Sequence, residues 1–310
     1  MTYSRAALVI AAQDSIAQGS KSFGLASRLF DRKTRERAWL LYSWCRKCDD
    51  IADGQDHGGA LSVVENPHER LAFIRAMTER ALAGEVTGDP AFDALGLVVS
   101  ECRIPHQWPR DLVLGFAMDT DEFSPRHESD LLTYCYHVAG IVGLMMAVVM
   151  GVDPEDTETL DRACDLGLAF QLANIARDIG EDAAAGRCYL PEEWLVEADI
   201  PPGEHMKPHY RSRLADISWW LADMAQDYEA SARIGAAKLP FRSRWAVLSA
   251  AGIYGDIARE VAVRGQSAWD HRVHTSKLAK LGWVIKAFAQ ARKKASEATS
   301  REGLWTRPPL

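Results

Sequence analysis

The sequence lacks the features that mark a secreted or nucleic-acid-binding protein. Its first residues combine one arginine with a short apolar run that Gln13 and Asp14 interrupt, so the apolar core and cleavage site of a signal peptide are missing. Acidic side chains outnumber basic ones by 43 to 36, which gives a formal charge of −7 and excludes a basic footprint for nucleic acid on the whole chain. A phosphate-containing ligand would therefore have to be bound locally.

Cysteines are few and scattered, with six in 310 residues. A chain of this length does not need disulfides to be stable, so we expect reduced thiols and a cytoplasmic location. Cys45 and Cys48 form a Cys-x-x-Cys pair, which could be half of a redox or zinc site. No second pair follows at zinc spacing, and we therefore expect both to be packed helix residues.

Long apolar runs and strand-like alternation are also missing. No run reaches the roughly 20 residues that span a bilayer. The longest, 138–152, contains three glycines and stops at Asp153, as a buried core helix would. Helical periodicity dominates instead and predicts helices at 34–53, 67–83, 90–102, 107–118, 129–151, 155–181, 208–236, 243–264 and 275–296.

The breaks between these helices are short, and no linker divides the chain. We expect one all-α domain over residues 1–300, followed by a frayed C-terminal tail at 301–310. Many of the helices are apolar over much of their surface, which predicts a multi-helix bundle. Binding sites in such bundles form between facing helices.

A first acidic motif closes the predicted helix 34–53. Asp49 and Asp53 are four residues apart and share one helix face, whereas Asp50 points roughly a quarter turn away. Arg46 lies three residues before Asp49. The preceding helix is mostly apolar, so carboxylates at its end suggest a cavity that holds something positive.

A second polar motif runs along the predicted helix 155–181 and just beyond it. Gln171, Asn174, Asp178 and Asp182 follow at spacings of three, four and four and share one face. The rest of this helix is apolar. Polar groups inside a buried helix are costly unless each has a partner.

Two such motifs favour a magnesium site. Mg²⁺ prefers oxygen ligands, keeps several waters and bridges to phosphates, whereas zinc would need His and Cys. A solvated acidic face would explain the first motif alone, and general acid–base catalysis is the weaker alternative for the pair. Several cations are candidate phosphate contacts, although each one alone could be a surface ion pair: Lys21, Arg46, Arg177, Arg187 and Arg272.

The motifs resemble those of the squalene/phytoene synthase family in kind and in order. The segments that carry the resemblance are 19–23, 41–50, 134–143, 171–182 and 186–191. The run from Trp44 to Asp50 is most similar to the bacterial phytoene-forming branch. Gly54 stands where many relatives have another acid, which leaves Asp49 and Asp53 in place.

The resemblance implies an isoprenoid synthase fold with a central cavity. It implies that two geranylgeranyl diphosphates are joined head to head through a cyclopropyl diphosphate to phytoene and two pyrophosphates. Mg²⁺, or Mn²⁺ in its place, would be held by Asp49, Asp53, Asn174, Asp178 and Asp182. The diphosphate would contact or lie near Ser20, Ser22, Tyr42, Arg46, Gln171, Arg177, Tyr254 and Arg272. The catalytic residues would be the four aspartates with the cavity residues Tyr134 and Tyr189.

The residues alone leave several of these roles open. A buried tyrosine is ordinarily a core residue with a satisfied hydroxyl, although an aromatic face can also stabilise a carbocation. Ala139, Gly140 and Gly143 could allow close helix packing or leave room for a prenyl chain. His137, within one of the matching segments, is expected to be a hydrogen-bonded core residue.

Alternatives of other classes also stay open. The same chemistry on farnesyl diphosphate would give squalene or dehydrosqualene. A non-catalytic assembly protein on this fold should have lost aspartates that are intact here. A reductive step with a nicotinamide is not indicated by any Gly-rich fingerprint, although related enzymes need none.

A hydrophobic substrate and product, as the resemblance implies, suggest peripheral contact with a membrane. Trp219 and Trp220 are one candidate contact, and the basic segment 277–294 with its interleaved apolar residues is another. A solvated helix face packed on the core is the more ordinary interpretation of that segment. Isoprenyl diphosphates are the expected ligands, and other carotenoid pathway enzymes are candidate partners.

Overall fold

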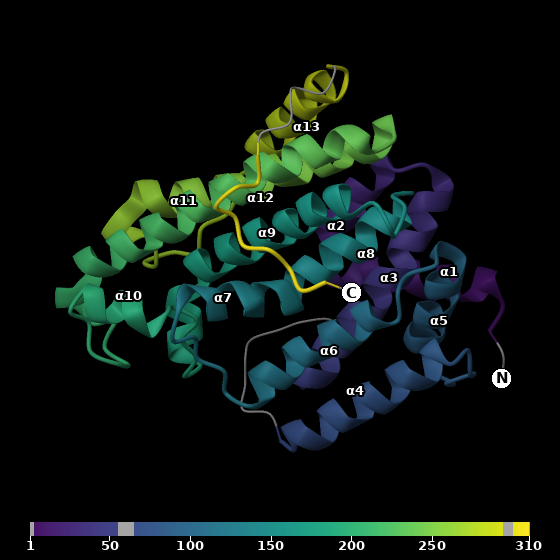
Figure 1. Cartoon of the computed structure of the whole chain (residues 1–310), viewed down its shortest axis with the longest axis horizontal. Helices are drawn as coiled ribbons and strands as arrows, with labels where there is room; N and C mark the ends of the chain where they lie inside the picture. The colour runs from purple at the N-terminus through teal and green to yellow at the C-terminus, as the bar shows by residue number, and fades with distance from the viewer. Residues whose placement is uncertain (1–2, 55–64, 294–299, 310) are drawn as a thin grey trace.

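The structure, a computed structural model, describes residues 3–54, 65–293 and 300–309, without the side chains of Lys21 and Ser22. Within these residues every regular element is helical, with thirteen α-helices and a few 3-10 and π-helical turns. The predicted all-α fold is confirmed. The helices surround α9 (Thr157–Ala184), against which α7, α8, α11 and α12 pack (Figure 1).

The N-terminal part begins with two helices that the periodicity did not predict, α1 (Arg5–Gly19) and α2 (Lys21–Ala26). Each has a serine cap: Ser4 Oγ accepts a hydrogen bond from Ala7 N at 3.2 Å, and Ser20 Oγ accepts one from Phe23 N at 3.2 Å. The next helix, α3 (Arg32–Asp53), ends at Gly54, whose φ of 64° favours glycine. The helices α4 (Pro67–Leu82), α5 (Pro90–Cys102) and α6 (Gln107–Thr120) follow close to their predicted bounds.

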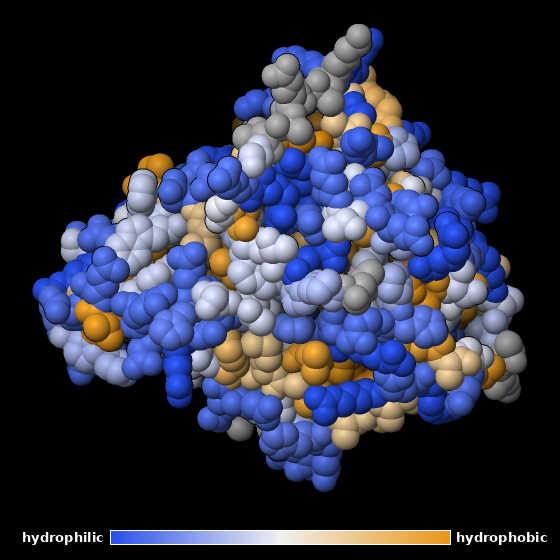
Figure 2. Space-filling model, viewed as in Figure 1, coloured by the Kyte–Doolittle hydropathy of each residue, from blue (hydrophilic) through white to orange (hydrophobic). Residues whose placement is uncertain are grey.

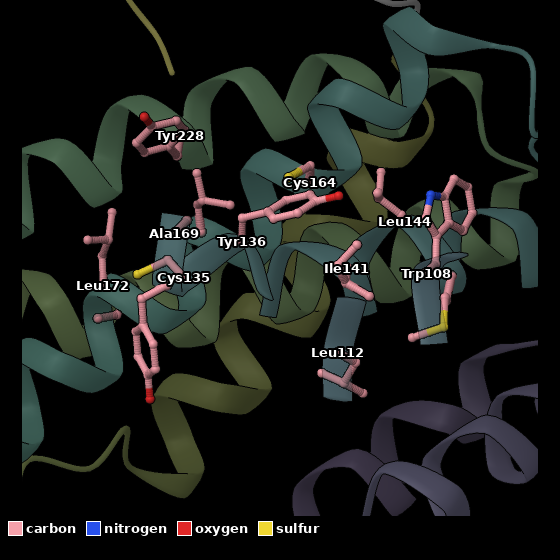
Figure 3. Packing of buried hydrophobic residues seen from close by; sticks show 14 of the residues in the cluster. Trp108, Leu112, Cys135, Tyr136, Ile141, Leu144, Cys164, Ala169, Leu172 and Tyr228 are labelled. Carbon is pink, nitrogen blue, oxygen red and sulfur yellow. The ribbon is translucent and has the colours of Figure 1, made fainter. Parts of the chain in front are cut away.

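The helix predicted at 129–151 is divided. It consists of α7 (Glu128–Cys135), a π-helical turn at Tyr136–Gly140 and α8 (Ile141–Val149). Such turns insert a residue and are frequent at functional sites. Figure 3 shows Tyr136, Ile141 and Leu144 from this segment packed in the core with Cys164 of α9.

By length and composition this segment, Glu128–Val149, is able to cross a membrane, contrary to the expectation that no run is long enough. However, 61% of its apolar 18-residue window is buried inside the protein, in agreement with the predicted core helix. The close-packing interpretation of its glycines also holds. A Cβ on Gly143 would overlap the backbone oxygen of Ala163, and one on Gly140 would lie 2.8 Å from Cys164 Sγ.

The C-terminal half contains α9, the short and unpredicted α10 (Glu192–Glu197), α11 (Arg211–Gly235), α12 (Phe241–Arg264) and α13 (Lys277–Ala291). In Figure 1, α13 lies on α12 at the top of the molecule, and α10 lies at the left. The helix predicted up to residue 296 ends at Ala291, and residues 294–299 lie outside the described part.

The frayed C-terminus predicted from the sequence is wrong for residues 301–309. This segment crosses α9 (Figure 1), where Arg301 makes two hydrogen bonds of 2.8 Å with Asp165 and Arg307 makes one of 2.7 Å with Asp161. Trp305 packs against Tyr136 at a ring distance of 5.6 Å. The sequence did not indicate this because the partners lie more than a hundred residues away along the chain.

Candidate active site

The end of α3 presents the first acidic motif. Asp49 and Asp53 lie on one face, and burial raises the pKa of Asp49 to about 7; the Arg46 guanidinium opposes this shift and the charge of Asp53 adds to it. Burial also raises the pKa of Asp53. Arg46 pairs with Asp50, through a hydrogen bond of 3.0 Å and a second, shorter one, so its guanidinium is held at the site from the same helix.

The second motif lies at the end of α9. Arg177 donates two hydrogen bonds to the Asp178 carboxylate, at 2.7 and 2.5 Å. Arg272, from the loop after α12, donates to the same carboxylate at 3.0 Å and also to Glu181. Burial raises the pKa of Asp182 to about 7, with a further contribution from the charge of Asp178.

Arg187 links the two motifs. Its backbone N–H donates to the carbonyl of Asp182 at 2.8 Å, which fixes the chain just after α9. Its guanidinium lies 3.9 Å from the Asp53 carboxylate at the end of α3. The two acidic helix ends, about 130 residues apart in sequence, therefore face each other across this arginine.

Asp119, at the end of α6, is a site residue that the sequence reasoning missed. Its carboxylate accepts hydrogen bonds from Tyr134 at 3.0 Å and from Tyr189 at 2.8 Å, and burial raises its pKa. Its charge also raises the pKa of both Asp49 and Asp182, so it lies within electrostatic reach of the two motifs. The available signal was a carboxylate that ends an apolar helix, as in the first motif.

The two tyrosines that Asp119 holds are stacked on each other. Their ring centroids are 4.8 Å apart with the planes inclined by 19°, and Phe123 stacks on Tyr134 at 5.3 Å. Both tyrosines are buried. The site therefore has an aromatic wall, formed by Phe123, Tyr134 and Tyr189. Both tyrosine hydroxyl groups of this wall donate to the Asp119 carboxylate.

Other predicted residues line the same region. Tyr254 of α12 stacks on Phe170 of α9 at 4.3 Å. Tyr42 packs on Phe23 at 5.5 Å, and burial raises its pKa to about 12. Gly19 lies so close that an added Cβ would be 2.6 Å from the Tyr42 hydroxyl, which brings the junction of α1 and α2 to the site.

The predicted serine and amide residues have other surroundings. The Ser20 hydroxyl caps α2, and the side chain of Ser22 lies outside the described residues. Gln171 and Asn174 are half-buried on the face of α9 that carries Asp178. His137 Nδ1 lies 3.0 Å from the carbonyl of Asp111, as a hydrogen-bonded core residue would.

The donor set suits a hard cation that keeps other ligands. The end of α3 offers carboxylate oxygens, and the end of α9 offers carboxylate and amide oxygens, which Mg²⁺ prefers. Within the described residues, no three His, Cys, Asp or Glu side chains are close enough to hold a metal ion by themselves. A cation here would share its shell between one or two carboxylates, waters and diphosphate oxygens, which is the ordinary arrangement for Mg²⁺.

The cysteine pair belongs to the core. All six cysteines are free, Cys48 is fully buried, and burial raises the pKa of the Cys45 and Cys48 thiols. A thiol with a raised pKa is a poor nucleophile and a poor metal ligand.

Comparison with known proteins identifies relatives over nearly the whole chain. A sequence model of the family described as "Squalene/phytoene synthase" matches residues 16–279. A phytoene synthase of Pseudescherichia vulneris is 46% identical over 301 residues, covering 96% of this chain and 97% of that protein. A 15-cis-phytoene synthase of a Paracoccus species is 45% identical over 309 residues, covering 97% and 98%.

A solved structure agrees with the fold. The crystal structure of a dehydrosqualene synthase in complex with a ligand superposes with a TM-score of 0.82 at 26% identity. The match covers 92% of this chain and 96% of that one.

Proposed function

Because the chain belongs to the squalene/phytoene synthase family, we propose that it is a prenyltransferase that joins two geranylgeranyl diphosphates head to head to form phytoene in carotenoid biosynthesis. The first molecule loses its diphosphate to become an allylic cation, the double bond of the second attacks it, and loss of a proton closes the cyclopropane ring. The resulting cyclopropyl diphosphate loses the second diphosphate, rearranges and gives up a second proton. Each phytoene is thus accompanied by two pyrophosphates and two protons.

One observation carries this proposal: two half-buried acidic helix ends face each other across Arg187. Members of the family act on prenyl diphosphates and generally use divalent metal ions. We assign Mg²⁺, or Mn²⁺ in its place, to Asp49 and Asp53 on one side and to Asn174, Asp178 and Asp182 on the other. Bound Mg²⁺ neutralises charge on a departing diphosphate.

The arginines would orient the diphosphate. Arg177 and Arg272 already hold the Asp178 carboxylate through charge-assisted hydrogen bonds, and the same donors suit phosphate oxygens. Arg46 lies on α3, and Arg187, from the segment after α9, lies beside Asp53 of α3. Their positions support a site in which the diphosphate lies between the two helix ends.

The aromatic wall would serve the organic part of the substrate. Tyr134 and Tyr189 are fixed by their stacking and by Asp119, so they can hold a constant position beside a prenyl chain. Aromatic faces attract cations, and a carbocation passing them would be stabilised. We assign Tyr42, Tyr254 and Gln171 to the lining of the same space.

The direct test is product analysis after incubation with geranylgeranyl diphosphate and Mg²⁺. We expect phytoene, and we expect turnover to fall below detection in Asp49→Ala and in Asp178→Ala. Asp14→Ala, which removes an exposed carboxylate of α1, is the matched control and should leave turnover unchanged. Normal turnover in Asp49→Ala would exclude the proposed metal role.

A second candidate is dehydrosqualene formation from farnesyl diphosphate, which the structural likeness to a dehydrosqualene synthase favours. Preference for farnesyl diphosphate in a competition assay would decide for it. A reduced product that appears only with NADPH would instead point to a squalene-forming enzyme. The non-catalytic alternative is disfavoured because both motifs keep their aspartates.

A further inference from the structure

An apolar helix face is exposed on α13. Leu278, Leu281, Ile285 and Phe288 follow at spacings of three, four and three and therefore share one face. Their exposed fractions are 82%, 57%, 64% and 37%. Phe241 of α12, 42% exposed, extends this face through a ring contact of 5.6 Å with Phe288. Figure 2 shows orange atoms at the top of the molecule, where α13 lies in Figure 1.

The opposite side of α13 anchors the helix to the protein. Trp283 packs on Gly252 of α12 and donates a hydrogen bond to Asp256, while Trp245 of α12 donates to the carbonyl of Val284 at 2.8 Å. Ala287 and Ala291 are buried. The helix is thus attached to the protein by one face, and its exposed apolar face points away from the core.

The charged side chains of α13 have one sign. Helix α13 contains no acidic residue, and exposed cations flank the apolar face at Lys277, Lys286, Arg292 and Lys293. The chain as a whole carries a formal charge of −7, so this is a local departure from its average. Such a surface is complementary to a negatively charged, apolar boundary.

We propose that this face of α13 docks the protein on an anionic lipid bilayer. The helix would lie in the plane of the interface, with its apolar side chains at the boundary of headgroups and acyl chains and its cations against lipid phosphates. A second copy fits this face less well, because a two-fold contact would place the same cations opposite one another.

The proposal also rests in part on the proposed function. A hydrocarbon product needs an apolar phase to leave into, and α12, on which α13 lies, carries Tyr254 at the candidate site. The docking face would bring this wall of the enzyme to the bilayer.

Flotation with lipid vesicles tests the docking without any turnover. The protein should float with vesicles of phosphatidylcholine and phosphatidylglycerol. Binding should weaken about tenfold or more in Ile285→Glu, because a charge would replace a hydrocarbon side chain that enters the bilayer. Val196→Glu is the matched control. Val196 is 68% exposed on α10, away from α13 (Figure 1), and its substitution should leave binding unchanged.

Two further measurements separate the electrostatic part of docking from the apolar part, and docking from catalysis. Lys286→Gln with Lys293→Gln should weaken binding to the anionic vesicles and reduce its dependence on salt. Product formation from substrate in detergent micelles should be unchanged in Ile285→Glu, so loss of docking and loss of activity are read independently.

Equal flotation of wild type and Ile285→Glu would overturn the proposal. The proposal would also be overturned if the wild-type protein did not float with vesicles and instead sedimented as a dimer without them, and if Ile285→Glu dissociated that dimer. That second result would make the face a contact between two copies.

Discussion

Asp119 illustrates how a single residue can organise a site. Its carboxylate holds two stacked tyrosines and lies within electrostatic reach of both acidic motifs. Spacing rules found Asp49, Asp53, Asp178 and Asp182 because each pair lies on one helix. They missed Asp119 because its partners lie on other elements, at contacts that no local pattern records.

Replacing Asp119 by Asn should lower kcat by about tenfold or more, because hydrogen bonds to a neutral acceptor are weaker than those to a carboxylate. Steady-state kinetics and urea unfolding should be measured on the same sample. Tyr136→Phe is the control, since its hydroxyl donates to Asp111 at 3.3 Å in the core, and it should keep normal turnover. A normal kcat in Asp119→Asn would show that Asp119 does not contribute to catalysis.

Arg272 gives a second prediction. Arg272→Gln should raise KM for the diphosphate substrate about tenfold and leave kcat nearly unchanged, because it removes a charge-assisted contact. Arg264→Gln is a matched control: Arg264 is similarly exposed, at 35% against 39%, and pairs with Glu260. An effect of the same size in both variants would show that loss of a surface cation, and not contact at the site, is responsible.

At the scale of helices, the sequence predicted the long elements and missed the short ones. Long helices repeat their apolar pattern often enough to be recognised, whereas α2 and α10 have six residues each. The 15-residue helix α1 is an exception: Ser4 caps it, but its residues 6–12 are a continuous apolar run without helical periodicity. The π-helical turn within 129–151 has no pattern of its own.

The contact between α8 and α9 yields a prediction about stability. Gly143→Ala should destabilise the protein by about 2 kcal/mol or more, because its Cβ would overlap the backbone oxygen of Ala163. Gly282→Ala is the control within another helix, where an added Cβ meets nothing within 4 Å. It should stabilise by about 0.5–1 kcal/mol through helix propensity.

Urea unfolding of the three proteins measures both effects. A Gly143→Ala protein as stable as the wild type would mean that α8 and α9 can move apart without cost, which would contradict a requirement for glycine at this close contact.

At the scale of the whole molecule, the C-terminal segment ties distant parts together. Asp165 is 1% exposed in its side chain and is held by Arg301 from 136 residues further along the chain and by Ser231 at 2.5 Å. The sequence could not predict this, because an arginine near a terminus is ordinarily solvated. The division into a domain at 1–300 and a tail stays a prediction, although residues 301–309 pack on the bundle.

Arg301→Ala should therefore destabilise the protein by about 3 kcal/mol or more, since it leaves a buried carboxylate without its cation. Arg80→Ala, which breaks an exposed ion pair of 3.3 Å with Glu85, should cost about 1 kcal/mol or less. Urea unfolding midpoints compare the two. Equal effects would show that the C-terminal segment contributes no more than a surface contact does.

We expect the site between the two acidic helix ends to convert geranylgeranyl diphosphate to phytoene. To test this, the protein is incubated with Mg²⁺ and equal concentrations of geranylgeranyl and farnesyl diphosphate, and the hydrocarbon products are identified. We expect phytoene as the main product and none after Mg²⁺ is chelated. Dehydrosqualene or squalene as the main product, or phytoene formed without a divalent metal ion, would contradict this expectation.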